Sequence, residues 1–325
     1  MTGPYAFHLH VVGWITVAAV GVAYVVAGRR APPTSQASTT PTRRQWWCLA
    51  GGLLSLAVAI TWPVADLAAH WSLTALLVQR LLLILACAPL LLLALPSPLI
   101  AALTRPEPVD RALEVLTRPV VAVVVFSVIA VGTLLTPVVA AQASSGVVRG
   151  VVDVVLLFGG VVLWGPVLRH IPGASRPSAV GLAVYLFVQS IVPGFPSVIY
   201  VFAHHPLYPA FAHAHAAIGL SAVGDQQLAG VMAKVATLPV LWSVAYVALS
   251  RAARQDSAGA DITVLTWAEV ERQLLRAERR EKRGPGRRAG RLPAIPRPGL
   301  ATGVDGTGTA PPTSELPGEP PSPSR

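Results

Sequence analysis

The stretch Leu81–Leu95 has the sequence LLLILACAPLLLLAL, and Val120–Leu135 has the sequence VVAVVVFSVIAVGTLL. Neither stretch contains a charged residue. Apolar runs of about 20 residues are long enough to cross the roughly 30 Å hydrocarbon core of a bilayer. Backbone groups inside that core must pair within their own segment, so a helix is the expected structure. The two stretches therefore predict an all-α membrane protein.

Similar apolar segments recur along the chain. Seven can be marked, at residues 11–28, 46–62, 72–95, 119–140, 150–168, 179–202 and 228–250. The sixth carries Pro193-Gly194-Phe195-Pro196, and two prolines so close are expected to kink or end the helix there. The sequence predicts a polytopic bundle of about seven transmembrane helices.

Arginine residues are concentrated in alternate connections. They occur in residues 29–45, 96–118, 169–178 and after 250, whereas 63–71 and 203–227 contain no Lys or Arg and 141–149 contains only Arg149. Basic residues favour cytoplasmic loops, so this alternation predicts an outer N-terminus and a cytoplasmic C-terminus. No basic region precedes the first segment, and Arg29-Arg30 follows it. That order predicts an uncleaved first helix rather than a signal peptide.

The composition agrees with a membrane protein. Hydrophobic residues make up 53% of the 325 residues and charged residues 12%, against roughly 25% charged residues in a typical soluble domain. The net charge of +10 follows the loops and the C-terminal tail, which is typical of membrane orientation and argues against nucleic-acid binding. Cys48 and Cys87 form no CxxC motif and are interpreted as small packing residues.

Three regions are predicted along the chain. Residues 1–250 form the transmembrane domain. Residues 251–283 form a basic amphipathic segment, in which Trp267, Val270, Leu274 and Leu275 share one helical face among Arg and Glu; such a segment can lie on an anionic inner leaflet. Residues 284–325 are rich in Pro, Gly and Ser and are expected to be disordered.

The histidines suggest a metal site. On the predicted topology seven of the eight histidines lie at the outer side, and imidazole is a common ligand of copper and zinc. The alternative is that these histidines are polar residues suited to an interface. His8–His10 and His213–His215 are spaced i, i+2, which does not place both on one helix face. The candidate metal ligands are His70, His204, His205, His213 and His215.

Charged residues inside the segments suggest a second kind of site. Arg80 and Lys234 each lie about 10 Å below the predicted outer boundary, given a rise of about 1.5 Å per residue. A charge buried in a membrane is costly and normally paired, so we expect at least one of them to have a carboxylate within about 4 Å. One hypothesis is a polar chamber that opens outward; structural ion pairs or side chains extending to the interface are the alternative. The residues concerned are Asp66, Gln79, Arg80, Asp153, Asp225, Gln226 and Lys234.

Three stretches carry a resemblance to a known family. The first is Trp62-Pro63-Val64-Ala65-Asp66-Leu67, continued by Gln79, Ala88-Pro89-Leu90-Leu91 and Pro96. The second is Trp164-Gly165-Pro166-Val167-Leu168. The third is Pro206-Leu207-Tyr208-Pro209, followed by Gly219-Leu220-Ser221 and Asp225-Gln226-Gln227-Leu228-Ala229-Gly230. Over roughly residues 46–250 the chain resembles the CtaG-type cytochrome c oxidase assembly family, which are bacterial seven-helix membrane proteins implicated in copper supply to the oxidase. The chain looks like a divergent member, because Leu76 and Arg80 stand where the family usually has histidines, and Lys234 replaces an aromatic residue.

The resemblance implies a function. We expect a non-enzymatic protein of the bacterial cytoplasmic membrane that assists copper delivery or oxidase maturation at the outer face, with oxidase subunits or copper chaperones as partners besides the lipid bilayer. A metal-free structural or partner-binding protein is the alternative, and a small-solute transporter is a third. No internal repeat supports a transporter, and no P-loop, nucleotide fingerprint or Ser/His/Asp elbow supports an enzyme.

Overall fold

The computed structural model describes residues 7–30, 41–104, 106–168, 177–212 and 219–282. Side chains are described in these ranges except at 29–30, 97–98, 101 and 256–282. Helices account for most of the described chain, and no strand occurs within it. The all-α prediction is therefore confirmed.

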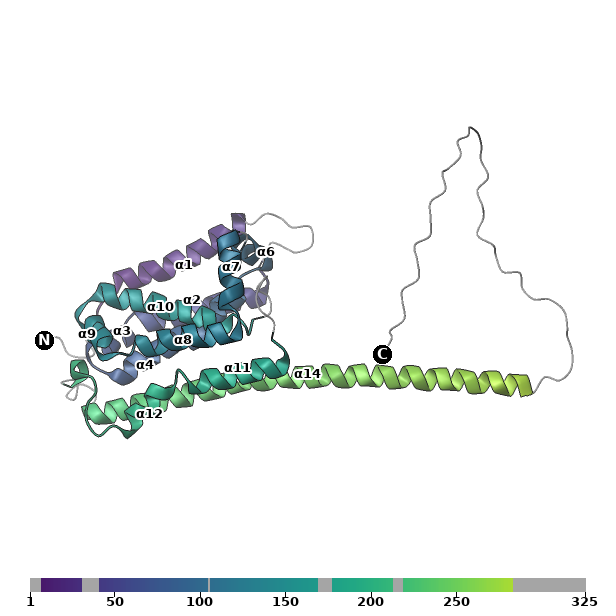
Figure 1. Ribbon diagram of the computed structural model, residues 1–325. Coiled ribbons are helices and arrows are strands. Elements are labelled where there is room, and N and C mark those ends of the chain that lie inside the picture. The colour runs from purple at the N-terminus through teal and green to yellow at the C-terminus, as the bar shows by residue number, and fades with distance from the viewer. Residues whose placement is uncertain (1–6, 31–40, 105, 169–176, 213–218, 283–325) are drawn as a thin grey trace, which may run out of the picture. The chain divides into compact units, whose positions relative to one another are not determined.

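Helices follow one another along the described chain (Figure 1). They are α1 Val11–Arg30, α2 Arg43–Ile60, α3 Val64–His70, α4 Leu73–Leu81, the π-helix η1 Leu82–Cys87, α5 Ala88–Ala94, α6 Ser97–Leu103, α7 Glu107–Leu116, α8 Pro119–Gly132, α9 Thr136–Ser144, α10 Gly146–Trp164, α11 Ala179–Ile191, α12 Phe195–Phe202, the 3₁₀ helix η2 Pro209–Phe211 and α14 Ala222–Lys282.

Six stretches are long and apolar enough to cross a membrane, by length and composition. They are Val11–Gly28, Arg43–His70, Leu73–Ala94, Gly146–Trp164, Ala179–Phe202 and Ala222–Gln255, and a bent pair, α7 with α8, raises the number to seven if it forms one span. This agrees with the prediction of about seven helices. The orientation of the termini is not tested by the fold and stays a prediction.

The fourth predicted segment, 119–140, is broken into α8 and α9. Pro137 has no backbone N–H, so a helix continuing from α8 could not donate to the carbonyl of Thr133. The chain turns after Gly132 and starts again at Thr136. With 14 residues, α8 is short for a complete span.

The sixth segment is broken as expected. α11 ends at Ile191 and α12 begins at Phe195, with Pro196 in its first turn. The third span is also irregular, because η1 interrupts it ahead of Pro89. The Trp164 indole donates a hydrogen bond of 2.9 Å to the Ile84 carbonyl of η1, so α10 satisfies a backbone group there.

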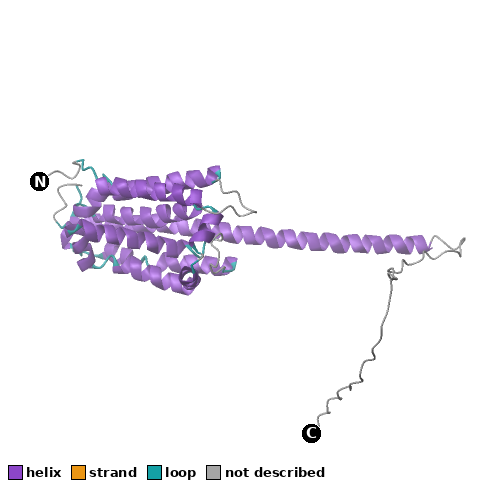
Figure 2. Cartoon of the chain, turned by 90° about the horizontal axis from the view of Figure 1, so that it is seen from above, coloured by secondary structure: helices purple, strands orange, loops and turns teal. Residues whose placement is uncertain are grey.

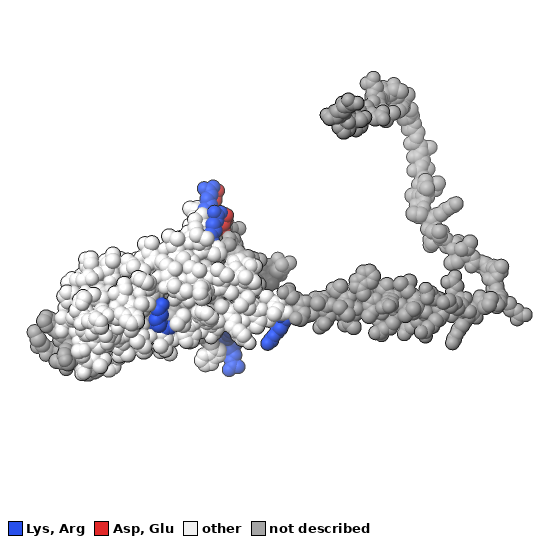
Figure 3. Space-filling model, turned by 60° about the horizontal axis from the view of Figure 1, so that its bottom comes forward, with Lys and Arg blue, Asp and Glu red and all other residues white. Residues whose placement is uncertain are grey.

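The bundle core is apolar and joins most of the helices. A single large cluster includes Leu83 of η1, Phe126 of α8, Leu156 of α10 and Leu186 of α11. Many large apolar side chains also point outward, such as Val120 (76% exposed) and Phe202 (72% exposed). Figure 2 shows the helices of the bundle side by side, and the face in Figure 3 is almost free of charged residues. An apolar surface of this extent is suited to lipid contact.

The connection 96–118 is largely helical. α7 lies at 87° to α8 and carries exposed ion pairs between Arg111 and Glu107 and between Arg118 and Glu114. At the other end of the chain, α14 continues to Lys282, with side chains described to Gln255. The predicted amphipathic face, residues 267–275, therefore lies outside the described side chains, and residues 284–325 lie outside the described residues.

Candidate functional site

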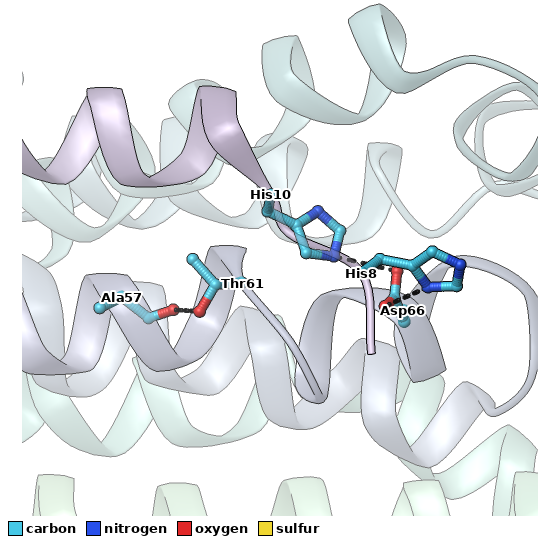
Figure 4. A network of polar contacts seen from close by, with 5 residues as sticks. All are labelled: His8, His10, Ala57, Thr61 and Asp66. Atoms are coloured by element: carbon cyan, nitrogen blue, oxygen red, sulfur yellow. Dashed lines mark hydrogen bonds and ion pairs between the residues drawn. The ribbon is translucent and has the colours of Figure 1, made fainter. Parts of the chain in front are cut away.

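Asp66 is contacted by two histidines (Figure 4). It lies in the first turn of α3, while His8 and His10 precede α1 in non-helical backbone. His8 Nδ1 lies 3.1 Å from Asp66 Oδ2, and His10 Nε2 lies 3.0 Å from Asp66 Oδ1. The second contact lies at ion-pair distance but outside hydrogen-bond geometry, so His10 Nε2 is a buried atom without a hydrogen-bond partner. The group places two imidazoles around one carboxylate.

A cavity of about 920 Å³ begins beside this group and is lined by His10. Its other polar residues include Thr16 of α1, Gln79 of α4 and Arg149 and Asp153 of α10. The Gln79 amide donates to both Asp153 carboxylate oxygens, at 3.2 and 3.3 Å. The rest of the lining is largely aliphatic, including Val20, Leu56, Leu83 and Leu157. The cavity is therefore polar near the start of α10 and apolar further along it.

Asp225 is used as a helix cap. Its carboxylate accepts hydrogen bonds from the Ser72 hydroxyl (2.7 Å) and from the backbone N–H groups of Leu73 (2.6 Å) and Thr74 (3.3 Å) at the start of α4. The neighbouring Gln226 accepts from the Leu207 N–H at 2.8 Å. Both side chains are almost fully buried. They connect the start of α14 to α4 and to the loop after α12.

The same loop is tied to the break between α8 and α9. The Tyr208 hydroxyl donates to the Leu134 carbonyl at 2.7 Å and accepts from the Tyr200 hydroxyl. Burial raises the pKa of the Tyr208 hydroxyl, so it stays neutral and able to donate. Tyr208, in the third stretch that carries the family resemblance, therefore holds the loop after α12 against the break between α8 and α9.

Arg80 and Lys234 line a different cavity, of about 90 Å³. Among the described residues, which include all three candidate aspartates, no carboxylate lies within 4 Å of either cation. The predicted ion pair is therefore wrong. Asp66 is engaged with His8 and His10, Asp153 with Gln79, and Asp225 with α4, so none of them is directed at Arg80 or Lys234.

The seven residues of the predicted chamber consequently fall in separate places. Gln79 and Asp153 line the large cavity, Asp66 lies by the two histidines, and Asp225 and Gln226 join the loops. Arg80 and Lys234 remain in the small cavity.

The predicted histidine ligands are not brought together. His70 is exposed at the end of α3, within electrostatic range of Asp66. His204 and His205 are exposed in the loop after α12, and His213 and His215 lie outside the described residues. Within the described part of the chain, no group of three or more His, Cys, Asp or Glu side chains is arranged to hold a metal ion.

The predicted ligand set does not contain His8 and His10, although both are among the histidines predicted at the outer side. In extended backbone, residues i and i+2 point to the same side. The signal available in the sequence was their position ahead of the first apolar segment.

These features define a class, a multi-pass α-helical membrane protein with buried or half-buried polar groups around the starts of α4, α10 and α14. Residues 22–255 match the family described as cytochrome c oxidase caa3 assembly factor (Caa3_CtaG). The match covers more than half of the chain, so the protein belongs to this family, and the predicted resemblance is confirmed. No curated protein and no solved structure matches the chain.

Proposed function

We propose that this member of the oxidase assembly family handles copper for cytochrome c oxidase at the outer face of the bacterial cytoplasmic membrane, without catalysing a reaction. The observation that carries the proposal is the arrangement of His8 and His10 around Asp66. Imidazole nitrogen and carboxylate oxygen are donors suited to copper(II). His70, at the end of the same helix α3, interacts electrostatically with Asp66 and also with the cation Arg149.

Copper is the cargo in this proposal. The contacts of Asp66 are hydrogen-bond and ion-pair contacts, so a metal would have to displace them as it binds. A site held by few ligands suits a protein that passes a metal on, because release must follow capture. The adjoining cavity, with Gln79 and Asp153 on its wall, is the internal space into which His10 faces.

A metal-free, partner-binding role is the second candidate. It is favoured by the lack of a preformed group of three metal donors in the described residues. Arg80 also supports it, because a permanent cation stands where the family usually has a histidine.

The test is complementation of a deletion strain. A His8→Asn/His10→Asn variant keeps polar side chains beside Asp66 but removes both imidazoles. We expect oxidase activity to fall several-fold and to recover partly with excess copper, and the copper content of the purified protein to fall. A second variant, with His204, His205, His213 and His215 all changed to Ala, tests separately whether the histidines of the predicted outer loop are needed for oxidase activity. His170 is the one histidine that the predicted topology places on the cytoplasmic side. His170→Asn is therefore the matched control and should leave activity unchanged.

The outcomes separate the two candidates. If both multiple variants support normal oxidase activity at equal membrane abundance while the deletion strain does not, the copper role is rejected and the metal-free role remains. Normal oxidase activity in the deletion strain itself would reject the copper role and favour the metal-free role.

A further inference from the structure

Arg80 carries a positive charge within the third membrane-spanning stretch and is only 4% exposed. Its guanidinium donates to the Thr133 hydroxyl at 2.9 Å and to the Thr133 carbonyl at 2.7 Å. That carbonyl is accessible because Pro137 prevents α8 from continuing. Both acceptors are neutral, and Arg80 Nε is buried without a partner. Since an arginine keeps its proton in proteins, a full charge is buried here with incomplete hydrogen bonding.

Lys234 of α14 brings a second cation to the same cavity. Its ammonium makes one long contact, 3.5 Å to the Ser190 carbonyl. It lies against Gly194, where an added Cβ would come within 2.6 Å of Lys234 Nζ. The break between α11 and α12 therefore provides the space in which this ammonium sits.

The charge of Arg80 is only weakly compensated by a carboxylate. Asp153 interacts electrostatically with Arg80, but its two oxygens accept hydrogen bonds from Gln79 and it also faces Arg149. Like charges that share a low-dielectric space repel, and an uncompensated charge in a membrane interior is costly. A negative ion in the cavity that both side chains line would reduce both costs.

We propose that this cavity is a binding site for a small monovalent inorganic anion of the size of chloride. A water molecule requires about 10–15 Å³ by the same kind of measure, so about 90 Å³ accommodates the anion and a few waters. Ser197 and Thr237 add hydroxyl groups to the lining, and the buried Gln189 Oε1, which has no partner, would accept from a water beside the anion. The remaining walls are apolar, including Ile84, Phe126 and Leu156, which strengthens the attraction between the ion and the two cations.

The site does not depend on the copper proposal. It joins α4, α11 and α14 rather than the segment before α1, and its two positive charges oppose the binding of a metal cation. Binding of the anion only to the folded bundle would stabilise that bundle by mass action.

The test uses the full chain purified in detergent. Thermal unfolding is followed in chloride and in gluconate, which is too large for the cavity, at equal ionic strength. We expect a saturable rise of about 2–5 °C in the unfolding midpoint with chloride. Bromide should replace chloride, and Arg80→Gln and Lys234→Met should each abolish the rise. Arg149→Gln, which removes a cation from the other cavity, should retain it.

Equal midpoints in chloride and gluconate for the wild type would overturn the proposal, as would a chloride effect of full size in both charge variants. If those variants do not fold, chloride-35 NMR line broadening on the wild-type protein decides. Broadening that bromide reverses supports the site, and its absence rejects it.

Discussion

Asp225 illustrates how a single buried charge can be stabilised inside an apolar bundle. It is 3% exposed, and its carboxylate accepts one hydrogen bond from the Ser72 hydroxyl, directly before α4, and two from the N–H groups of the first two residues of α4. The N-terminus of a helix favours a negative charge, because unpaired N–H groups and the helix dipole both point there. One side chain of α14 therefore fixes where α4 starts.

Replacing Asp225 by Asn should lower the free energy of unfolding by about 1.5–3 kcal/mol, because the charge and one acceptor are lost while two N–H groups stay buried. Asp225→Ala should cost more. Gln227→Ala, which removes only a long contact of 3.4 Å to the Ala203 carbonyl, is the control and should cost less than about 0.5 kcal/mol. Denaturant unfolding in detergent micelles measures these differences. If Asp225→Asn unfolds with the same free energy as the wild type, the contacts of Asp225 with α4 do not contribute to stability.

At the scale of the helices, the two breaks in the predicted spans differ in how clearly the sequence marks them. Pro193 and Pro196 are close together with Gly194 between them, so the end of α11 could be predicted. The break after Gly132 rests on Pro137 alone, within a segment whose apolar character continues to Val139. The break leaves the Thr133 carbonyl without a helical partner, and Arg80, which bonds to that carbonyl, lies 53 residues earlier in the chain. That contact could not be predicted from the sequence.

Close helix packing leads to a prediction at Gly160 of α10. A Cβ there would lie 2.6 Å from Ala88 Cβ and 3.2 Å from Ile84 Cα, which cannot move aside as a flexible side chain could. Gly160→Ala should therefore lower the free energy of unfolding by about 1–3 kcal/mol. Gly150→Ala in the same helix meets nothing within 4 Å and should be neutral or raise stability by up to about 1 kcal/mol, because alanine favours helix. Thermal unfolding of the two variants side by side checks this, and an equal effect would contradict the packing argument.

For the whole molecule, the spans could be predicted but the sites could not. Apolar length is a local property, so segments such as 72–95 and 179–202 are visible in the sequence. The contact of Asp66 with His8 joins residues 58 positions apart, and Asp225 reaches Ser72 across 153. The predicted depth correctly placed Arg80 and Lys234 at the same level of the bundle, where both line one cavity. Depth alone does not show which of the two cavities a residue lines, because the cavities are separated by the packing of the helices.

The orientation of the bundle decides whether the Asp66 group can meet copper outside the cell. Basic residues are retained on the cytoplasmic side, so the loop 203–227, with no Lys or Arg, should face outward and the chain after 250 inward. In a background with Cys48→Ala and Cys87→Ala, single cysteines replace the exposed residues Ser221 and Gln255. An impermeant thiol reagent should label position 221 in intact cells and position 255 only after permeabilisation. The reverse pattern would place Asp66, which is joined to the same end of the bundle through α3 and α4, in the cytoplasm, and it would overturn the proposal that copper is handled at the outer face.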